Sequence, residues 1–126
     1  MEKSCTIQSE NYRLEGLHTD AGNSRAVVVT HPHPLFGGDM YNQVVEAIIK
    51  TYCRNGFNTL RFNFRGVGNS QGRYAEGVGE QEDVRAAVAY LIGRGMTAID
   101  LVGYSFGAWV NAKTDLADHP IGDMVL

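Results

Sequence analysis

The 126 residues are enough for one domain with a sizeable core, because 44% of them are hydrophobic. The formal net charge of −3 offers no basic surface, so we expect neither nucleic acid nor a membrane as a partner. No apolar run approaches the ~20 residues of a membrane span, and residues 1–8 lack the apolar core of a secretory signal. The two cysteines form no C-x-x-C motif. We therefore expect a cytoplasmic protein.

Alternating polar and apolar residues open the chain, over residues 5–8 and 12–18. This period of two predicts antiparallel strands with one solvated face. The continuous apolar run 26–30 is rich in valine, which is typical of a strand covered on both faces. A loop rich in histidine, proline and glycine follows over 31–39.

Apolar residues between 44 and 53 recur with the period of an α-helix. We expect Asp39 to cap the beginning of this helix and Gly56 to follow its end. Residues 57–64 predict another strand, and a glycine-rich loop then runs to Gly79.

A second amphipathic pattern over 84–92 predicts another helix, and the apolar run 99–102 predicts another strand. A third helix is expected to reach about Asp118, and a last strand to begin near Met124. The whole pattern predicts an α/β fold in a single domain over 1–126. We expect a mostly parallel sheet with an antiparallel N-terminal hairpin and flanking helices.

Three unusual loops leave from the carboxyl ends of predicted strands, after Thr30, Phe64 and Val102. In open α/β sheets, ligands bind beyond these strand ends. We therefore expect the three loops to converge on one site.

The last of these loops contains the pentapeptide G-Y-S-F-G over 103–107. A strand, a G-x-S-x-G sequence and a helix make up a nucleophile elbow, in which the glycines let strand and helix approach closely. The alternative is an ordinary strand-to-helix turn. The elbow interpretation predicts Ser105 as a nucleophile and the backbone N–H of Phe106 as a donor to an oxyanion.

The first loop contains H-P-H-P-L-F-G-G over 31–38, where this architecture places the second oxyanion donor. Pro32 and Pro34 have no N–H. We therefore expect a later residue to be the donor, with Leu35 as the first candidate and Phe36 as the second.

His31 and His33 in this loop allow two interpretations. An H-x-H pair at a strand end is a candidate zinc site, but no third ligand cluster accompanies it in the sequence. We expect no metal, and we expect both histidines to shape the loop.

The middle loop reads F-R-G-V-G-N-S-Q-G over 64–72. Its G-x-G-x-x-x-G spacing differs from the dinucleotide fingerprint, no helix opens on it, and no P-loop lysine follows. We expect no nucleotide cofactor here. A rigid loop in which Arg65 holds backbone or carboxylate neighbours explains the sequence better.

Together, the segments 31–40, 64–72 and 103–107 resemble the α/β-hydrolase superfamily, and the resemblance runs over essentially the whole chain. The closest likeness is to small bacterial hydrolases related to dienelactone hydrolases and short esterases. The resemblance implies a serine hydrolase acting on a small ester or related acyl substrate. It further implies Ser105 as the nucleophile, an oxyanion hole from Leu35 and Phe106, and no cofactor.

The family's catalytic acid and histidine follow later strands, and no segment here corresponds to them. Asp115, Asp118 and His119 are expected on or just past the helix that leads away from the elbow, and Asp123 before a strand at the wrong edge. We interpret the chain as a truncated N-terminal part of a hydrolase domain. A non-catalytic binding module or pseudoenzyme and a small peptidase remain alternatives. Exposure of the last strand predicts self-association or a homo-oligomer.

Overall fold

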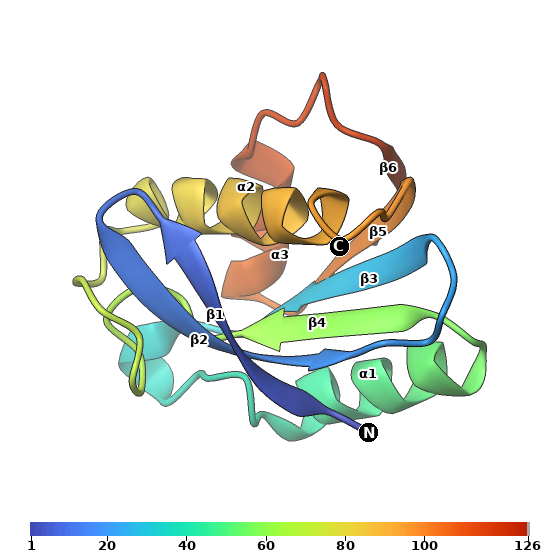
Figure 1. Cartoon of the computed structure of the whole chain (residues 1–126). Helices are drawn as coiled ribbons and strands as arrows, with labels where there is room; N and C mark the ends of the chain where they lie inside the picture. Colours follow the sequence, from blue (N-terminus) through green and yellow to red (C-terminus); the bar gives the residue numbers. More distant parts are fainter. Residues whose placement is uncertain (126) are drawn as a thin grey trace.

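A computed structural model describes residues 1–125 of the chain as a single sheet covered by helices on both faces (Figure 1). The elements, in chain order, are β1 (Lys3–Ser9), β2 (Tyr12–Thr19), β3 (Arg25–Thr30), η1 (Pro34–Phe36), α1 (Gln43–Arg54), β4 (Asn58–Phe62), α2 (Gly79–Ile92), β5 (Ala98–Gly103), α3 (Phe106–Lys113) and β6 (Ile121–Val125). Among the described residues, none of the helices combines the length and the apolar character that a membrane crossing requires.

The sheet has six strands in the order β1-β2-β4-β3-β5-β6. The β1–β2 hairpin is antiparallel and pairs with β4, also antiparallel. The neighbours β4, β3, β5 and β6 are parallel to one another. The prediction of an α/β fold with a mostly parallel sheet and an antiparallel N-terminal hairpin is therefore confirmed.

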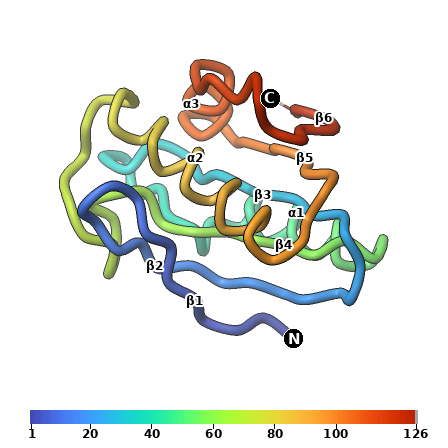
Figure 2. Tube along the Cα trace, turned by 45° about the horizontal axis from the view of Figure 1, so that its top comes forward, coloured from blue at the N-terminus to red at the C-terminus, as the bar shows by residue number. Residues whose placement is uncertain are grey.

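The central strand β3 explains why its sequence is apolar without interruption. Val27 and Val29 point to the face covered by α1, where they pack with Val45. Ala26 and Val28 point to the opposite core, which α2 and α3 cover. Figures 1 and 2 show α1 on one face of the sheet and α2 and α3 on the other. Both faces of β3 are buried, as the run of β-branched residues predicts.

The beginning of α1 differs from the prediction. Asn42, not Asp39, caps this helix, because its side-chain oxygen accepts a hydrogen bond from the Val44 N–H at 2.9 Å. The Asp39 carboxylate instead accepts a hydrogen bond from the Tyr41 N–H in a preceding turn. Gly56 follows the helix with a φ of +80°, as expected of a glycine at this position.

The third helix is shorter than predicted and ends at Lys113 rather than near Asp118. Thr114 already has an extended backbone, with a ψ of 127°. The Asp115 carboxylate then accepts a hydrogen bond from the Ala117 N–H, which forms a local turn. Side-chain bonding of this kind competes with continuation of the helix.

The last strand begins at Ile121, earlier than the predicted start near Met124. Asp123 therefore lies inside β6 and not before it, which corrects the sequence interpretation. Within residues 1–125, β6 pairs with β5 alone and forms an edge of the sheet. Its apolar side chains Met124 and Val125 are partly exposed.

We propose that this edge makes the 126-residue chain self-associate when it is expressed alone, because apolar edge strands pair with other chains. Sedimentation velocity is expected to show dimers or larger species. A Met124→Lys substitution places a charge on the edge and should shift the chain toward monomer. A compact monomer before any substitution would contradict the proposal.

Candidate active site

The three loops predicted to converge do lie together at one edge of the sheet. They follow β3, β4 and β5, which are neighbours with parallel directions. Hydrogen bonds join the loops directly: the Tyr104 N–H donates to the Thr30 carbonyl at 3.2 Å. The Phe64 N–H donates to the Nε2 of His31 at 3.1 Å. This edge is the candidate active site.

Ser105 lies in the turn between β5 and α3 with its side chain exposed. Its backbone has a φ of +58° and a ψ of −116°, which an L-residue rarely adopts. Such a conformation costs on the order of 1–3 kcal/mol and persists only where the surroundings enforce it. The strand, the strained turn and the helix together have the geometry of a nucleophile elbow.

The two glycines of the pentapeptide are required by close backbone contacts. A Cβ atom on Gly103 would lie 2.4 Å from the Ala108 nitrogen. A Cβ atom on Gly107 would lie 2.6 Å from the carbonyl oxygen of Thr30. Both obstacles are backbone atoms, which cannot move aside as a flexible side chain can. Glycine at both positions therefore lets α3 begin directly against the ends of β3 and β5.

His31 is fully buried between the first two loops. Its Nε2 accepts the Phe64 N–H, so Nδ1 carries the proton and donates to the Pro32 carbonyl at 2.7 Å. Burial lowers the pKa of His31 from 6.5 to about 4, against the smaller opposing effect of the Pro32 carbonyl. The imidazole is therefore neutral at pH 7, and it joins two loops through its ring.

His33 is also engaged at both ring nitrogens. Its Nδ1 accepts a hydrogen bond from the Leu35 N–H at 3.1 Å, and its Nε2 lies 3.1 Å from the hydroxyl of Tyr74. The Phe36 N–H donates to the His33 carbonyl at 3.1 Å. Both candidate donors of this loop are thus occupied here. Leu35 remains a predicted oxyanion donor, and it requires the bond to His33 to be released first.

Phe106 is the first residue of α3. The N–H groups of a first helical turn have no acceptor within their own helix, and they carry the positive end of the helix dipole. The Phe106 N–H therefore has the position that an oxyanion donor needs, next to Ser105. Its role in an oxyanion hole remains a prediction.

Arg65 holds the middle loop through charged partners on two other elements. Its guanidinium donates to the Asp83 carboxylate on α2, at 2.9 Å from Nη2 and 3.1 Å from Nε, and to Glu10 at 2.8 Å. The Arg65 N–H and the Ser9 hydroxyl also donate to Asp83. The carboxylate neighbours that the sequence interpretation anticipated are thus Asp83 and Glu10.

The sequence analysis missed two fully buried acids on α2, Glu80 and Asp83. Glu80 accepts hydrogen bonds from the backbone N–H groups of Ala75 at 2.8 Å and Gly77 at 3.0 Å. The helical spacing could have predicted their burial, because both acids lie on the same face of α2 as the apolar residues one turn later. A charged residue on such a face is buried only when it is paired.

The metal alternative for the first loop finds no geometric support. Both ring nitrogens of His31 and of His33 are engaged by backbone or hydroxyl groups. Within residues 1–125, His, Cys, Asp and Glu side chains form no group of three or more that could hold a metal ion. The absence of a metal remains a prediction for the protein.

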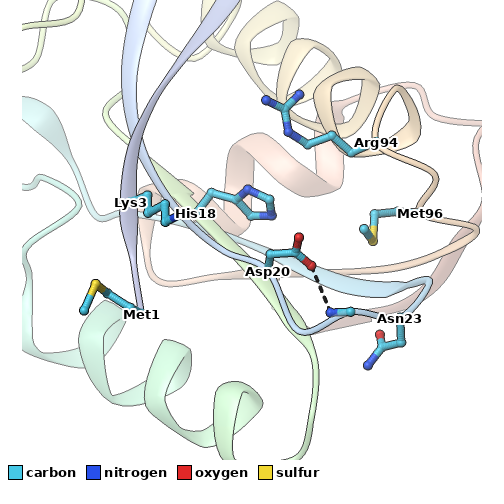
Figure 3. Close-up of a pocket in the computed structure, with 8 residues that line it drawn as sticks. Met1, Lys3, His18, Asp20, Asn23, Arg94 and Met96 are labelled. Atoms are coloured by element: carbon cyan, nitrogen blue, oxygen red, sulfur yellow. Dashed lines mark hydrogen bonds between the residues drawn. The ribbon is translucent and has the colours of Figure 1, made fainter.

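A separate polar cavity of about 630 Å³ lies at the opposite end of the sheet (Figure 3). Lys3, His18, Asp20, Arg94 and Met96 are among its lining residues. Burial, and secondarily the charge of Arg94, lowers the pKa of His18. None of the predicted site residues lines this cavity, so it does not belong to the Ser105 site.

Comparison with known proteins identifies the fold. No protein-family model matches the sequence. An uncharacterised protein of Rickettsia prowazekii (strain Madrid E) is 44% identical over 102 residues, which cover 78% of this chain and 43% of that protein. An α/β serine hydrolase homologue from Coxiella burnetii aligns with a TM-score of 0.82 and 42% identity, over 88% of this chain and 55% of its own. The chain belongs to the α/β-hydrolase superfamily.

A further α/β-hydrolase neighbour is an esterase from Pyrococcus furiosus, with a TM-score of 0.81 and 28% identity. The match covers 90% of this chain and 45% of that esterase. The chain therefore spans about half the length of the proteins to which it is similar. The recognised family and the partial hydrolase fold agree with the sequence analysis.

The buried pair Arg65–Asp83 gives a stability prediction for the chain. Asp83→Asn should lower the free energy of unfolding by roughly 3 kcal/mol, because it removes the buried counter-charge of the guanidinium and leaves only the half-exposed Glu10. Urea denaturation measures this change. Glu82→Gln on the same helix is the control, because the half-exposed Glu82–Arg85 pair contributes at most about 1 kcal/mol. Equal effects of the two substitutions would contradict the prediction.

The lowered pKa of His31 predicts a pH-dependent stability. Between pH 4 and 6.5 the unfolded chain binds a proton at His31 that the folded chain does not bind. The free energy of unfolding should therefore rise with pH across this window, by up to roughly 3 kcal/mol, and show no further contribution from His31 above it. Urea denaturation at pH 4.5 and pH 7 measures the rise. His31→Gln, whose amide oxygen can still accept the Phe64 N–H, should reduce it; an unchanged rise would refute the assignment.

Proposed function

We propose that the chain carries the nucleophile and the oxyanion donors of a serine hydrolase that acts on small esters or related acyl compounds. The observation that carries this proposal is the strained backbone of the exposed residue Ser105, which lies between two glycines that no other residue could replace. Strain of this kind is concentrated at functional sites. Similarity to a serine hydrolase homologue and to an esterase supports the ester-cleaving class. The cytoplasmic location expected from the sequence belongs to the same proposal.

In the proposed reaction, the Ser105 hydroxyl oxygen attacks the acyl carbon while a histidine takes its proton. The tetrahedral intermediate collapses as the histidine returns the proton to the leaving alcohol, and water then hydrolyses the acyl-enzyme. His31 and His33 are poor candidates for this base, because their ring nitrogens are already engaged. We propose that the base and its acid come from the part of the hydrolase fold that this chain does not span.

The negative charge of the tetrahedral intermediate needs two donors. The Phe106 N–H supplies one at the start of α3, and the Leu35 N–H supplies the other once the His33 ring no longer accepts it. Each such donor contributes about 10²–10³-fold to the rate. If the Leu35 N–H stays bound to His33, turnover loses this factor, which favours the alternative of a non-catalytic binding module.

Covalent labelling of the full-length protein with a fluorophosphonate tests the assignment of Ser105. Mass spectrometry is expected to find the label on Ser105, and none on a Ser105→Ala variant. Ser4→Ala, a change on exposed β1, serves as the control and should label like the unmodified protein. Labelling of another serine, or none in the full-length protein, would overturn the proposal. Chelation with EDTA should leave ester hydrolysis unchanged.

Ser105→Gly provides a second test of the same residue. Glycine adopts a positive φ without strain, so this variant should be more stable than Ser105→Ala by about 1 kcal/mol. Both variants should lose hydrolysis. Thermal or urea unfolding of the two inactive variants measures the difference, and equal stability would show that the turn is not strained.

A further inference from the structure

Large apolar side chains remain exposed around Ser105, although most side chains of this kind are buried elsewhere. Leu35 is 64% exposed, Phe36 86%, Val78 70% and Trp109 47%. They come from three elements that meet at the candidate site: η1, the loop before α2, and α3. Contiguous exposed apolar surface on a folded protein usually marks a binding site.

Ring contacts join two of these side chains, Phe36 and Trp109, through His33 and Phe106. The ring centroid of His33 lies 4.9 Å from that of Phe36 and 4.8 Å from that of Phe106. Phe106 stacks on Trp109 with centroids 6.3 Å apart. Trp109 in turn packs against Gly77, the neighbour of Val78. We call this surface the apolar band; it consists of Phe36, His33, Phe106, Trp109 and Val78.

The loop before α2 is shaped to receive the Trp109 ring. A Cβ atom on Gly77 would lie 2.1 Å from Trp109, and Gly77 has a φ of +84°. The buried carboxylate of Glu80 holds this loop by accepting the N–H groups of Ala75 and Gly77. The Trp109 ring is therefore held against the backbone of this loop and stays half-exposed at the surface.

We infer that the apolar band binds the apolar group of the substrate, so that the preferred esters carry an aromatic or medium-length alkyl group rather than acetyl with a small alcohol. This inference rests on the proposed function at Ser105. Its own support is continuity with the site, because Phe106 follows Ser105 in the chain and forms the centre of the band. Trp109, one helical turn beyond Phe106, sets how far the bound group extends.

The energetics of apolar burial set the size of the expected preference. Each methylene group that leaves water for an apolar surface is worth about a threefold gain in kcat/KM when most of its area is covered. Lengthening the ester from acetyl to hexanoyl should therefore raise kcat/KM by at least about tenfold. The gain should stop once the chain extends past Trp109.

Hydrolysis of two ester series by the full-length protein tests the inference. One series lengthens the acyl group on p-nitrophenol, and the other lengthens the alcohol of an acetate ester, which shows which side of the ester the band binds. Trp109→Ala and Phe36→Ala should each reduce the length preference to less than about threefold. Ile92→Ala, a similar truncation at the far end of α2, should keep the full preference.

A binding measurement tests the same surface without turnover. Trp109 is the single tryptophan of these 126 residues. The part of the emission of Ser105→Ala that a further Trp109→Phe substitution removes therefore reports on the band. Ethyl hexanoate is expected to shift this emission to shorter wavelength in a saturable manner, while ethyl acetate leaves it unchanged. Gly77→Ala, which displaces the ring, should weaken the response.

The outcomes separate this inference from the proposed function. Suppose that hydrolysis depends on Ser105 but that Trp109→Ala and Phe36→Ala keep the length preference of the unmodified protein. This result would overturn the role of the band in substrate binding and leave the proposed function standing. Failure of Ser105 to label, together with a normal fluorescence response, would overturn the function and leave the band as a binding surface. An emission spectrum of Trp109 that ethyl hexanoate does not change would overturn the inference.

Discussion

The site depends on one contact between backbones, in which α3 meets the end of β3 at Gly107. No side chain fits between the Cα of Gly107 and the Thr30 carbonyl. This contact fixes where α3 begins. The backbone must therefore turn sharply at the single residue Ser105 to connect β5 to the helix. The positive φ of Ser105 follows from that demand. The cost of the strain is small beside the burial of β3, β5 and α3 against one another, which is how a packed sheet can hold a serine in an exposed and unfavourable turn.

Buried polar side chains hold the loops that leave the sheet, as the sheet itself holds the elbow. Irregular loops lack the partners that a strand or helix gives its backbone, and buried N–H groups must be paired. His31 pairs the N–H of Phe64, Asp83 pairs that of Arg65, and Glu80 pairs two more before α2. Each of these acceptors comes from an element distant in sequence or from the following helix. The loops are consequently rigid, and the surface that they present around Ser105 has a fixed shape.

These long-range partners also mark the limit of what the sequence could predict. The valines of β3 form one continuous run, and the glycines at 103 and 107 belong to one pentapeptide, so the sheet and the elbow could be predicted from short segments. The cap of α1 could not, because Asp39 and Asn42 are equally suitable residues and the path of the chain decides between them. Nor could the bond from Leu35 to the His33 ring, since a side-chain rotamer determines it.

The site therefore has two parts with different physical requirements. Bond-breaking needs atoms held to within fractions of an ångström, and here strain, glycine contacts and buried acids hold the backbone. Recognition of an apolar group needs only apolar surface next to the reacting atoms, because the hydrophobic effect has no directional requirement. Exposed rings on η1 and α3 satisfy that weaker requirement. Side chains of the apolar band can accordingly be exchanged to alter the preferred substrate. Gly103 and Gly107, in contrast, cannot be changed without disturbing the turn, and Ser105 cannot be changed without losing the proposed nucleophile.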